Sequence, residues 1–187
     1  MAGEEQLTLR QAGSDKLTTA EVARLHELMH EAFAADEDGG FTEDDWQHAL
    51  GGTHFLLETD GAIASHAAVV ERELHVGGVP LRTAYVEAVA TDPRRQGHGL
   101  GTQVMQAVGA FIDAGECQLA ALGTSSHGFY ERLGWRTWRG ASYVRTAGGQ
   151  VATLDEDGYI MVRPTPRSPA LDWDAPISCE WRAGDVW

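Results

Sequence analysis

A short basic, glycine-rich segment, Arg94–Gly101, contains the residue types that most directly suggest chemistry. It follows an apolar run, Thr83–Thr91, that is typical of a buried strand, and it precedes an apolar pattern at helical spacing, Thr102–Ile112. Glycines let a backbone approach a ligand closely, and the unpaired N–H groups and the dipole of a helix N-terminus attract anions. The segment therefore predicts an anion site. The alternative is a glycine-rich turn that only caps the helix.

The spacing of the glycines excludes two common phosphate-binding motifs. The pattern G-x-x-x-x-G-K-S/T is absent, and G-x-G-x-x-G fails because Val104 stands where a glycine would have to follow Gly99 and Gly101. A zinc-hydrolase motif, H-E-x-x-H, is present at His26–His30. It lacks the usual continuation to a third ligand, and the neighbouring apolar stripe leaves both histidines near the solvent edge, so we expect no metal site.

Composition bounds the class of protein. The chain has 187 residues and a formal net charge of −14. We therefore expect one domain with a sizeable core, and no nucleic acid partner, since binding nucleic acid needs a basic surface. No apolar run approaches 18 residues and the first residues are acidic, so we expect no membrane span, no secretory signal and a cytoplasmic location. The two cysteines, Cys117 and Cys179, should then be reduced.

Hydrophobic periodicity predicts an α/β chain of mixed type. Helices are expected from the capping box Thr18–Glu21 to about Phe33, from Thr42 to Leu50, from Thr102 to about Ala114, and at Ser125–Leu133. Strands are expected at Leu7–Arg10, His54–Glu58, Ala62–Arg72, Leu74–Val76, Val79–Thr91, Gln118–Leu122, Trp135–Arg139, Ser142–Arg145, Gly158–Arg163 and in the tail. Asp60-Gly61 is a hairpin signal. This order predicts a mixed, twisted sheet with helices on both faces.

The segment Arg94–Gly101 resembles the pyrophosphate loop of the GNAT acetyltransferases, R/Q-x-x-G-x-G/A, in which Arg94, Gly97 and Gly99 fill the pattern. A second GNAT pattern, F/L-Y-x-x-x-G-F/W, is matched by Phe129–Trp135. The expected order of helices and strands is also that of the GNAT fold. The resemblance implies one GNAT domain over residues 1–187, in which residues 164–187 form a linker and a C-terminal strand that completes the substrate cleft.

The resemblance also implies acetyl-CoA as the cofactor, with its pantetheine on the strand before the loop and its pyrophosphate on the loop. The implied cofactor-binding residues are Val89, Thr91, Arg94, Arg95, Gln96, Gly97, His98, Gly99, Leu100, Gly101 and Thr102. No motif places a cysteine as an acyl carrier, so we expect direct transfer in a ternary complex.

Two residues could move protons in such a transfer. Tyr130 is a phenol, which stays protonated at neutral pH because its pKa is about 10, and it could donate to a departing thiolate. Its alternative role is aromatic packing. Glu87 lies at the centre of an apolar strand, and alternation places it on one face with Tyr85 and Val89. A carboxylate there is costly unless it is paired or functional. It could take a proton from a substrate ammonium through a water, or it could form a buried pair with an arginine.

Three segments, Gly40–Gly52, Ala84–Ala90 and Trp181–Trp187, are similar to the aminoglycoside 2'-N-acetyltransferases. The terminal heptapeptide is the most specific of them, because generic GNAT enzymes have nothing like it. The similarity implies acetylation of the 2'-amine of aminoglycoside antibiotics, resistance to them, and a homodimer. The residues that it places at the drug are Asp36 or Asp38, Asp45, Glu87, Gly123, Glu156, Asp185 and Trp187.

An array of carboxylates suits a polycation, because ammonium groups form charge-assisted hydrogen bonds with it. Each of these acids taken singly is more simply a solvated surface charge. The alternatives for the whole chain are a GNAT enzyme that acts on another amine, such as a polyamine or a peptide, and a non-catalytic protein that binds acyl-CoA or aminoglycosides.

Overall fold

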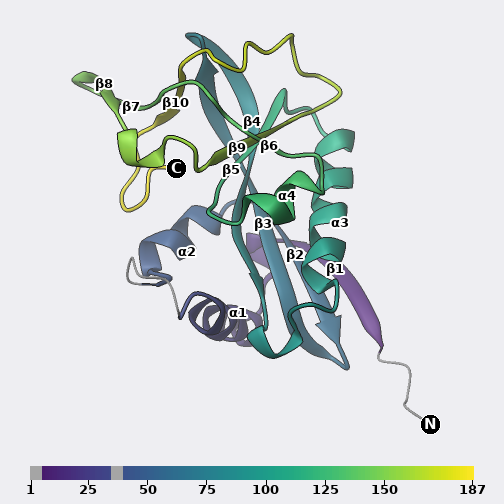
Figure 1. Ribbon diagram of the computed structural model, residues 1–187. Helices are drawn as coiled ribbons and strands as arrows, with labels where there is room; N and C mark the ends of the chain where they lie inside the picture. Colours follow the sequence, from purple (N-terminus) through teal and green to yellow (C-terminus); the bar gives the residue numbers. More distant parts are fainter. Residues whose placement is uncertain (1–5, 35–39) are drawn as a thin grey trace. The chain divides into compact units, whose positions relative to one another are not determined.

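The computed structural model describes residues 6–34 and 40–187 (Figure 1). Contacts divide the chain into two units, which are Met1–Val70 with Glu87–Gly109, and Glu71–Val86 with Ala110–Trp187. The chain enters the second unit twice, once in the middle of strand β3 (Ala62–Val76) and once within helix α3 (Leu100–Ala114). It returns to the first unit in the middle of strand β4 (Val79–Thr91).

The first unit contains an antiparallel meander. Strand β1 (Leu7–Gly13) pairs with β2 (Thr53–Thr59), and β2 pairs with the first part of β3. The turn between β2 and β3 is the predicted Asp60-Gly61, and both residues have positive φ values, 51° and 80°. Left-handed conformations at both central residues match the right-handed twist of the flanking strands, so the hairpin prediction is confirmed.

Two helices of the first unit begin at capping boxes that the sequence predicted or suggested. Helix α1 (Thr19–Ala32) begins after Thr18, whose side chain and backbone exchange hydrogen bonds with Glu21. Helix α2 (Glu43–Ala49) begins after Thr42, which forms the same reciprocal bonds with Asp45. Each box satisfies N–H groups that a helix start leaves unpaired.

The core of the first unit lies between α1, α2 and the strands. The buried residues that form it are Ala12, Leu25, Leu28, Met29, Trp46, Leu56, Ile63 and Ala90. Helix α3 runs along the other side of these strands (Figure 1). Helices therefore cover both faces of this part of the sheet, as the sequence predicted, and β3 and β4 are buried between them.

A pair of histidines is buried in the first unit, on β2 and β3. His54 Nδ1 lies 2.9 Å from His66 Nε2, and both side chains are inaccessible to solvent. Burial lowers the pKa of His54 to about 4, because a buried imidazolium loses its hydration. Burial and the neighbouring His54 lower the pKa of His66 to about 3. Both rings are therefore neutral in the folded protein at physiological pH.

The second unit contains a mixed set of strands. Strand β4 pairs in parallel with β5 (Leu119–Gly123), β5 pairs with β9 (Ile160–Pro164), and β9 pairs with β6 (Arg136–Thr137). The end of β3 pairs with the C-terminal strand β10 (Ile177–Glu180), which is parallel to β7 (Ser142–Thr146), and β7 pairs with β8 (Gly149–Ala152). Helix α4 spans His127–Glu131. Among the described residues, no helix is both long and apolar enough to span a bilayer.

Some predicted strands differ only at their ends, such as β1, which extends to Gly13, and β6, which is Arg136–Thr137 rather than Trp135–Arg139. Two differences are larger. The predicted strands Ala62–Arg72 and Leu74–Val76 are one strand, β3, because exposed Glu71 and Glu73 alternate with buried Arg72 and Leu74 and keep the period of two. Strand β8 was not predicted. Its four residues are all exposed and show no apolar alternation, so only its pairing with β7 identifies it as a strand.

The buried histidines should make stability fall as the pH drops below 6.5. Their folded-state pKa values lie below the unfolded value, so the unfolded chain binds more protons, and the stabilisation is complete above pH 6.5 and lost as the pH falls toward 4. When the pH falls from 7.5 to 5.5, the unfolding free energy should fall by about 1 kcal/mol for each histidine. Urea denaturation at pH 7.5, 6.5 and 5.5 measures this slope.

The variant His54→Gln should lose about half of that slope, whereas replacing the exposed loop residue His98 by Gln is the matched control. Carboxylates with lowered pKa values, such as Glu21 and Asp92, lose their stabilisation only at more acidic pH and do not obscure the result. An unchanged slope in His54→Gln would show that the pair does not couple protonation to folding.

Candidate functional site

The glycine-rich loop of the first unit joins β4 to α3 as the sequence predicted. Gly97 and Gly99 both have φ values of 79°, a left-handed conformation that L side chains rarely adopt. No heavy atom lies within 4 Å of the position that a Cβ would take at either glycine, so the loop presents bare backbone to open space. The carbonyl of Gly99 accepts the first bond of α3, from Gln103 N at 3.0 Å. The free N–H groups of the first helical turn therefore belong to Leu100–Thr102.

Arg94 is held by Asp92 rather than pointing freely from the loop. Its Nε and Nη2 atoms lie 2.9 and 3.0 Å from the two oxygens of Asp92, whose Oδ1 also accepts from Arg94 N. These hydrogen bonds are the main cause that lowers the pKa of the buried Asp92, and Arg24 adds to them. Sequence reasoning missed Asp92 as the organiser of the loop, although an Asp before a proline is a recognised signal for a capped turn.

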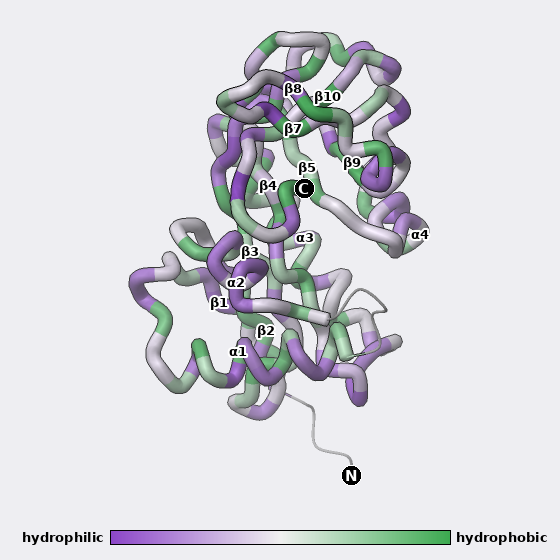
Figure 2. The backbone as a smooth tube through the Cα atoms, turned by 90° about the vertical axis from the view of Figure 1, so that its left-hand side faces the viewer, coloured by the Kyte–Doolittle hydropathy of each residue, from purple (hydrophilic) through white to green (hydrophobic). Residues whose placement is uncertain are grey.

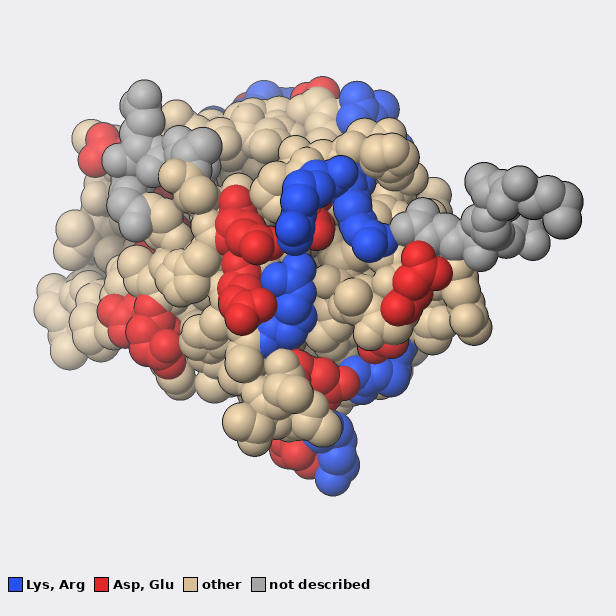
Figure 3. All heavy atoms as spheres, turned by 90° about the horizontal axis from the view of Figure 1, so that it is seen from below, with Lys and Arg blue, Asp and Glu red and all other residues tan. Residues whose placement is uncertain are grey.

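A depression of about 610 Å³ lies beside this loop within the first unit. Its charged lining residues are Arg24, Glu27, Glu31, Asp92, Arg94 and Arg95. Basic and acidic side chains lie directly beside one another on the face drawn in Figure 3. Since the arginines are matched by acids here, the affinity of this region for an anion must depend on the loop N–H groups as well as on side-chain charge.

Glu87 lies on β4 beside an irregularity that the sequence did not reveal. Ala88 has a φ of 50°, which is left-handed and unusual for a residue with a Cβ. This conformation interrupts the alternation of side chains, so the prediction that Glu87 and Val89 share a face does not follow from the strand period. Glu87 is half-buried, whereas Tyr85 two residues earlier is fully buried. The carboxylate is therefore not enclosed in the apolar core.

Thr91, at the end of β4, is already engaged by its neighbours. Its hydroxyl lies 2.8 Å from Ser65 Oγ, and its carbonyl accepts from Gln96 Nε2 at 3.4 Å. Val89 is half-buried. The predicted pantetheine contacts of these two residues stay a prediction.

In the second unit, Tyr130 lies on α4 within an aromatic cluster. Its ring makes edge contacts with Phe129 and Trp135, at centroid distances of 4.9 and 6.2 Å. Gly134 has a φ of 87° and lets the chain turn back, so that Trp135 N donates to the carbonyl of Tyr130. Burial raises the pKa of Tyr130 far above its ordinary value, because the phenolate would lose its hydration. The hydroxyl is thus protonated at any physiological pH.

The C-terminal residue is buried beside the end of β5 (Figure 2). A Cβ at Gly123 would lie 3.8 Å from both the terminal carbon of Trp187 and the hydroxyl oxygen of Tyr85. The structure therefore brings together Gly123 and Trp187, two residues that the sequence assigned to the substrate. A Cβ added at position 123 would therefore be in van der Waals contact with the C-terminus.

Two arginines fasten this C-terminal segment, and neither was singled out from the sequence. Buried Arg72 donates to the carbonyl of Val186 at 2.8 Å and to Glu180 Oε1 at 2.8 Å. Arg182 donates to the terminal oxygen of Trp187 at 2.9 Å. Both guanidinium groups also lie against the ring of Tyr85, 4.6 and 5.7 Å from its centroid. Charge-assisted hydrogen bonds from the two guanidinium groups, which lie against the buried ring of Tyr85, therefore hold the tail in place.

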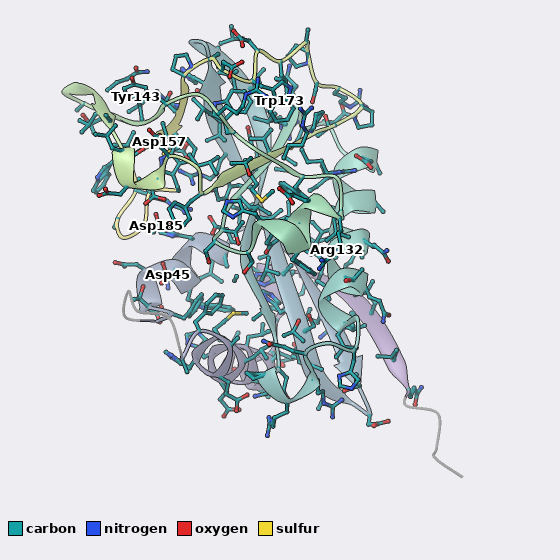
Figure 4. The ribbon with its side chains drawn as sticks, viewed as in Figure 1. Asp45, Arg132, Tyr143, Asp157, Trp173 and Asp185 are labelled. Atoms are coloured by element: carbon teal, nitrogen blue, oxygen red, sulfur yellow. The ribbon has the colours of Figure 1, made fainter. Side chains whose placement is uncertain are left out.

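A chain of hydrogen bonds links the last residue to the loop before β9. Trp187 Nε1 donates to Thr153 Oγ1 at 2.9 Å, Thr153 Oγ1 donates to Ser142 Oγ at 2.7 Å, and Ser142 Oγ reaches Asp157 Oδ1 at 2.7 Å. Asp157 and Asp185 are labelled in this part of the second unit in Figure 4. The same loop, η3 (Leu154–Glu156), carries the predicted Glu156. The C-terminus and the loop are therefore held by one network.

The remaining predicted acids have different settings. Asp185 is exposed and its Oδ1 accepts from Trp187 N at 3.0 Å, and Asp45 uses its Oδ2 in the cap of α2. Glu156 is half-buried. Asp36 and Asp38 lie outside the described residues.

The histidines of the H-E-x-x-H motif contact aromatic rings of the first unit. His26 lies 4.6 Å from the Trp46 ring and His30 lies 6.4 Å from the Phe41 ring, measured between centroids. Within residues 6–34 and 40–187, no three His, Cys, Asp or Glu side chains form a group that could hold a metal ion.

Comparison with known proteins agrees with the predicted family. The family described as Acetyltransferase (GNAT) domain matches residues 14–138. An aminoglycoside 2'-N-acetyltransferase from Mycolicibacterium fortuitum is 42% identical over 164 residues, which cover 86% of this chain and 82% of that protein.

Solved structures show the same fold. A GNAT family acetyltransferase from Brucella melitensis in complex with acetyl-CoA has a TM-score of 0.63, 15% identity and coverage of 96% of this chain and 98% of its own. A longer protein from Enterococcus faecalis, a probable N-acyltransferase, has a TM-score of 0.58 and 18% identity over 71% of this chain, which spans 33% of its length. The GNAT fold expected from the sequence is thus confirmed.

Replacing Thr153 by Val should destabilise the C-terminal network. The change keeps the shape of the side chain but leaves the buried Trp187 Nε1–H without its acceptor, so we expect the unfolding free energy to fall by about 1–3 kcal/mol. Urea denaturation measures the change. The exposed residue Thr8 on β1 offers a control, since Thr8→Val should alter stability little. Equal effects of the two substitutions would contradict the role given to Thr153.

Proposed function

This chain belongs to the GNAT acetyltransferase family, and on that premise we propose that it acetylates the 2'-amino group of aminoglycosides and so confers resistance to them. The chain is an acetyltransferase; the substrate and the regiochemistry are the proposal. The observation that carries it is the buried C-terminus next to Gly123: Arg182 and a hydrogen-bond chain hold Trp187, and Arg72 holds the carbonyl of Val186. The segment Trp181–Trp187 is the most specific of the three that resemble the aminoglycoside 2'-N-acetyltransferases.

The glycine-rich loop has the properties that acetyl-CoA, the cofactor of the family, requires. Two left-handed glycines without nearby atoms and the start of a helix suit a pyrophosphate, which would be held by the N–H groups of residues 96–102. Arg94 and Arg95 would contribute positive charge, with Arg94 oriented by Asp92. Acetyl-CoA supplies the acetyl group as an activated thioester.

Carboxylates oriented by backbone N–H groups would bind the ammonium groups of the drug. Asp45 uses one oxygen in the α2 cap, and Asp185 uses one oxygen to accept from Trp187 N. In each case the second oxygen can accept from an ammonium without reorganising the side chain. Glu156, the terminal carboxylate, and Asp36 or Asp38 complete the proposed set. The net charge of −14 favours the approach of a polycation.

Glu87 and Tyr130 are the residues that we assign to proton transfer. Glu87 would take a proton from the 2'-ammonium through a water, which its partial exposure permits. Tyr130 would donate the proton of its hydroxyl to the leaving thiolate, since burial keeps the phenol protonated. The cysteines do not suit a role as acyl carrier. Burial raises the pKa of Cys179 to about 11 and also raises that of Cys117, so neither is a ready thiolate nucleophile. This supports direct transfer from cofactor to amine.

The proposed reaction also explains how the chain would confer resistance. The acetylated drug loses one positive charge, which weakens its binding to RNA. A cytoplasmic location, a homodimer and the absence of a nucleic acid partner remain part of the proposal.

A thiol-release assay with acetyl-CoA tests the substrate and the position together. We expect turnover with aminoglycosides that carry a 2'-amine and none with those that carry a 2'-hydroxyl. Turnover with both groups would move the reaction to another amine of the drug. No turnover with any aminoglycoside would reject the proposed substrate, and polyamines and peptides would be the next amines to assay.

The substitution Glu87→Gln should lower kcat by roughly 100-fold or more, the usual range for losing a general base. The affinity for acetyl-CoA should stay close to that of the wild type, which isothermal titration can measure. Glu73→Gln, at another strand glutamate that is exposed, is the matched control. If kcat is unchanged in Glu87→Gln, then Glu87 has no part in proton transfer.

A further inference from the structure

The buried histidine pair belongs to a longer chain of hydrogen bonds within the first unit. Ser14 Oγ lies 2.9 Å from His54 Nε2, His54 Nδ1 lies 2.9 Å from His66 Nε2, and His66 Nδ1 lies 2.8 Å from the carbonyl oxygen of Ala88. At the outer end, the N–H of Gly51 donates to Ser14 Oγ at 3.0 Å. The chain thus runs from a partly exposed turn to the middle of β4.

The Ala88 carbonyl sets the direction of every bond in this chain. A carbonyl can only accept, so His66 Nδ1 must carry the proton that it donates. A neutral His66 then accepts at Nε2, and the donor is His54 Nδ1. The other nitrogen of His54, Nε2, must therefore accept, and its donor is the hydroxyl of Ser14. Each ring nitrogen has a partner of the right kind. A buried polar network that is fully satisfied in this way is rigid and specific.

The residue at the inner end of the chain has an unusual backbone. Ala88 is left-handed, with a φ of 50°. Such a conformation is disfavoured for a residue with a Cβ and persists only where the surrounding structure holds it. Its immediate neighbours are Glu87, the proposed base, and Val89, which the sequence assigns to the cofactor. The direction in which β4 presents both residues depends on the conformation of Ala88.

We propose that His66, supported by His54 and Ser14, is a positioning residue of the acetyl transfer, because its hydrogen bond to the Ala88 carbonyl holds the left-handed turn that sets Glu87 and Val89. The role of Glu87 in this statement rests on the proposed function. His66 itself is inaccessible to solvent, so in this proposal it acts through Ala88 and not by contact with substrate or cofactor. Ring packing links His54 to α2, since the centroid of the Trp46 ring lies 5.9 Å from that of His54 and 4.6 Å from that of His26.

Two substitutions at position 66 distinguish the effect of losing the hydrogen-bond donor to Ala88 from the effect of losing the imidazole ring. In His66→Asn the amide nitrogen can take the place of Nδ1 and still donate to Ala88, whereas in His66→Gln the amide takes the place of Nε2 and the donor to Ala88 is lost. We expect kcat to fall about 10- to 100-fold in His66→Gln, the effect of a small misplacement of a catalytic group. In His66→Asn most of the activity should return, and the KM for the amine should change little in either variant. Equal losses in the two variants, or no loss, would overturn the proposal.

A second substitution tests the backbone directly. Glycine adopts the left-handed conformation without cost, so Ala88→Gly should partly restore kcat in the His66→Gln background. If His66 only fills space in the core, Ala88→Gly should not restore activity. A lack of rescue would therefore contradict the proposal that His66 positions β4. If His66→Gln does not fold, Ser14→Ala serves instead. It removes the outer donor, and we expect a kcat loss of about threefold with the same rescue by Ala88→Gly.

Amide hydrogen exchange separates this proposal from the proposed function. Exchange in residues 87–91 should rise about tenfold in His66→Gln and stay near the wild-type rate in His66→Asn, whether or not aminoglycosides are substrates. If the wild type shows no turnover with aminoglycosides while this difference is present, then the function is wrong and His66 still positions the strand. If exchange is the same in both variants, then His66 does not hold Ala88.

Discussion

A buried group that can only accept or only donate a hydrogen bond dictates the state of every group linked to it. In the first unit the acceptor is the Ala88 carbonyl, and it fixes the protons on His66 and His54. In the second unit the donor is the indole of Trp187, and it fixes the hydroxyls of Thr153 and Ser142. Both chains end at residues assigned to the site or next to them. The cost of burying polar groups without partners therefore orders the two regions to which the proposed function assigns residues.

The loop to which we assign anion binding belongs to a strongly acidic chain. In the first unit Asp92 binds Arg94 at both oxygens, and Arg24 lies near the same carboxylate. These pairs stabilise the loop and at the same time reduce the positive charge that it offers. A phosphate there would depend on oriented backbone N–H groups, which keep their partial charges whatever the net charge of the protein. In the proposed site, Gly97 and Gly99 would let the phosphate approach these N–H groups, since neither carries a side chain.

What the sequence could predict was mostly local. The capping box at Thr18, the hairpin at Asp60-Gly61 and the order of strand, loop and helix around Arg94 each depend on a few consecutive residues, and all are present. The pairing of His54 with His66 depends on strand register, and the left-handed Ala88 has no signal in its residue type. The anchoring of the C-terminus by Arg72 joins residues 114 positions apart. Such contacts are set by tertiary packing, which local patterns do not encode.

The candidate substrate residues show why a resemblance can name acids that spacing alone could not select. In the structure, Asp45 and Asp185 each have one oxygen engaged by a backbone N–H, an arrangement that Glu21, Asp60 and Asp172 also have. A side chain held in this way has already lost its rotational freedom before an ammonium arrives, so less entropy is lost on binding. The remaining oxygen keeps its share of the delocalised charge and a defined direction. An array of such groups discriminates among polycations by the positions of their amines, which a merely acidic surface cannot do.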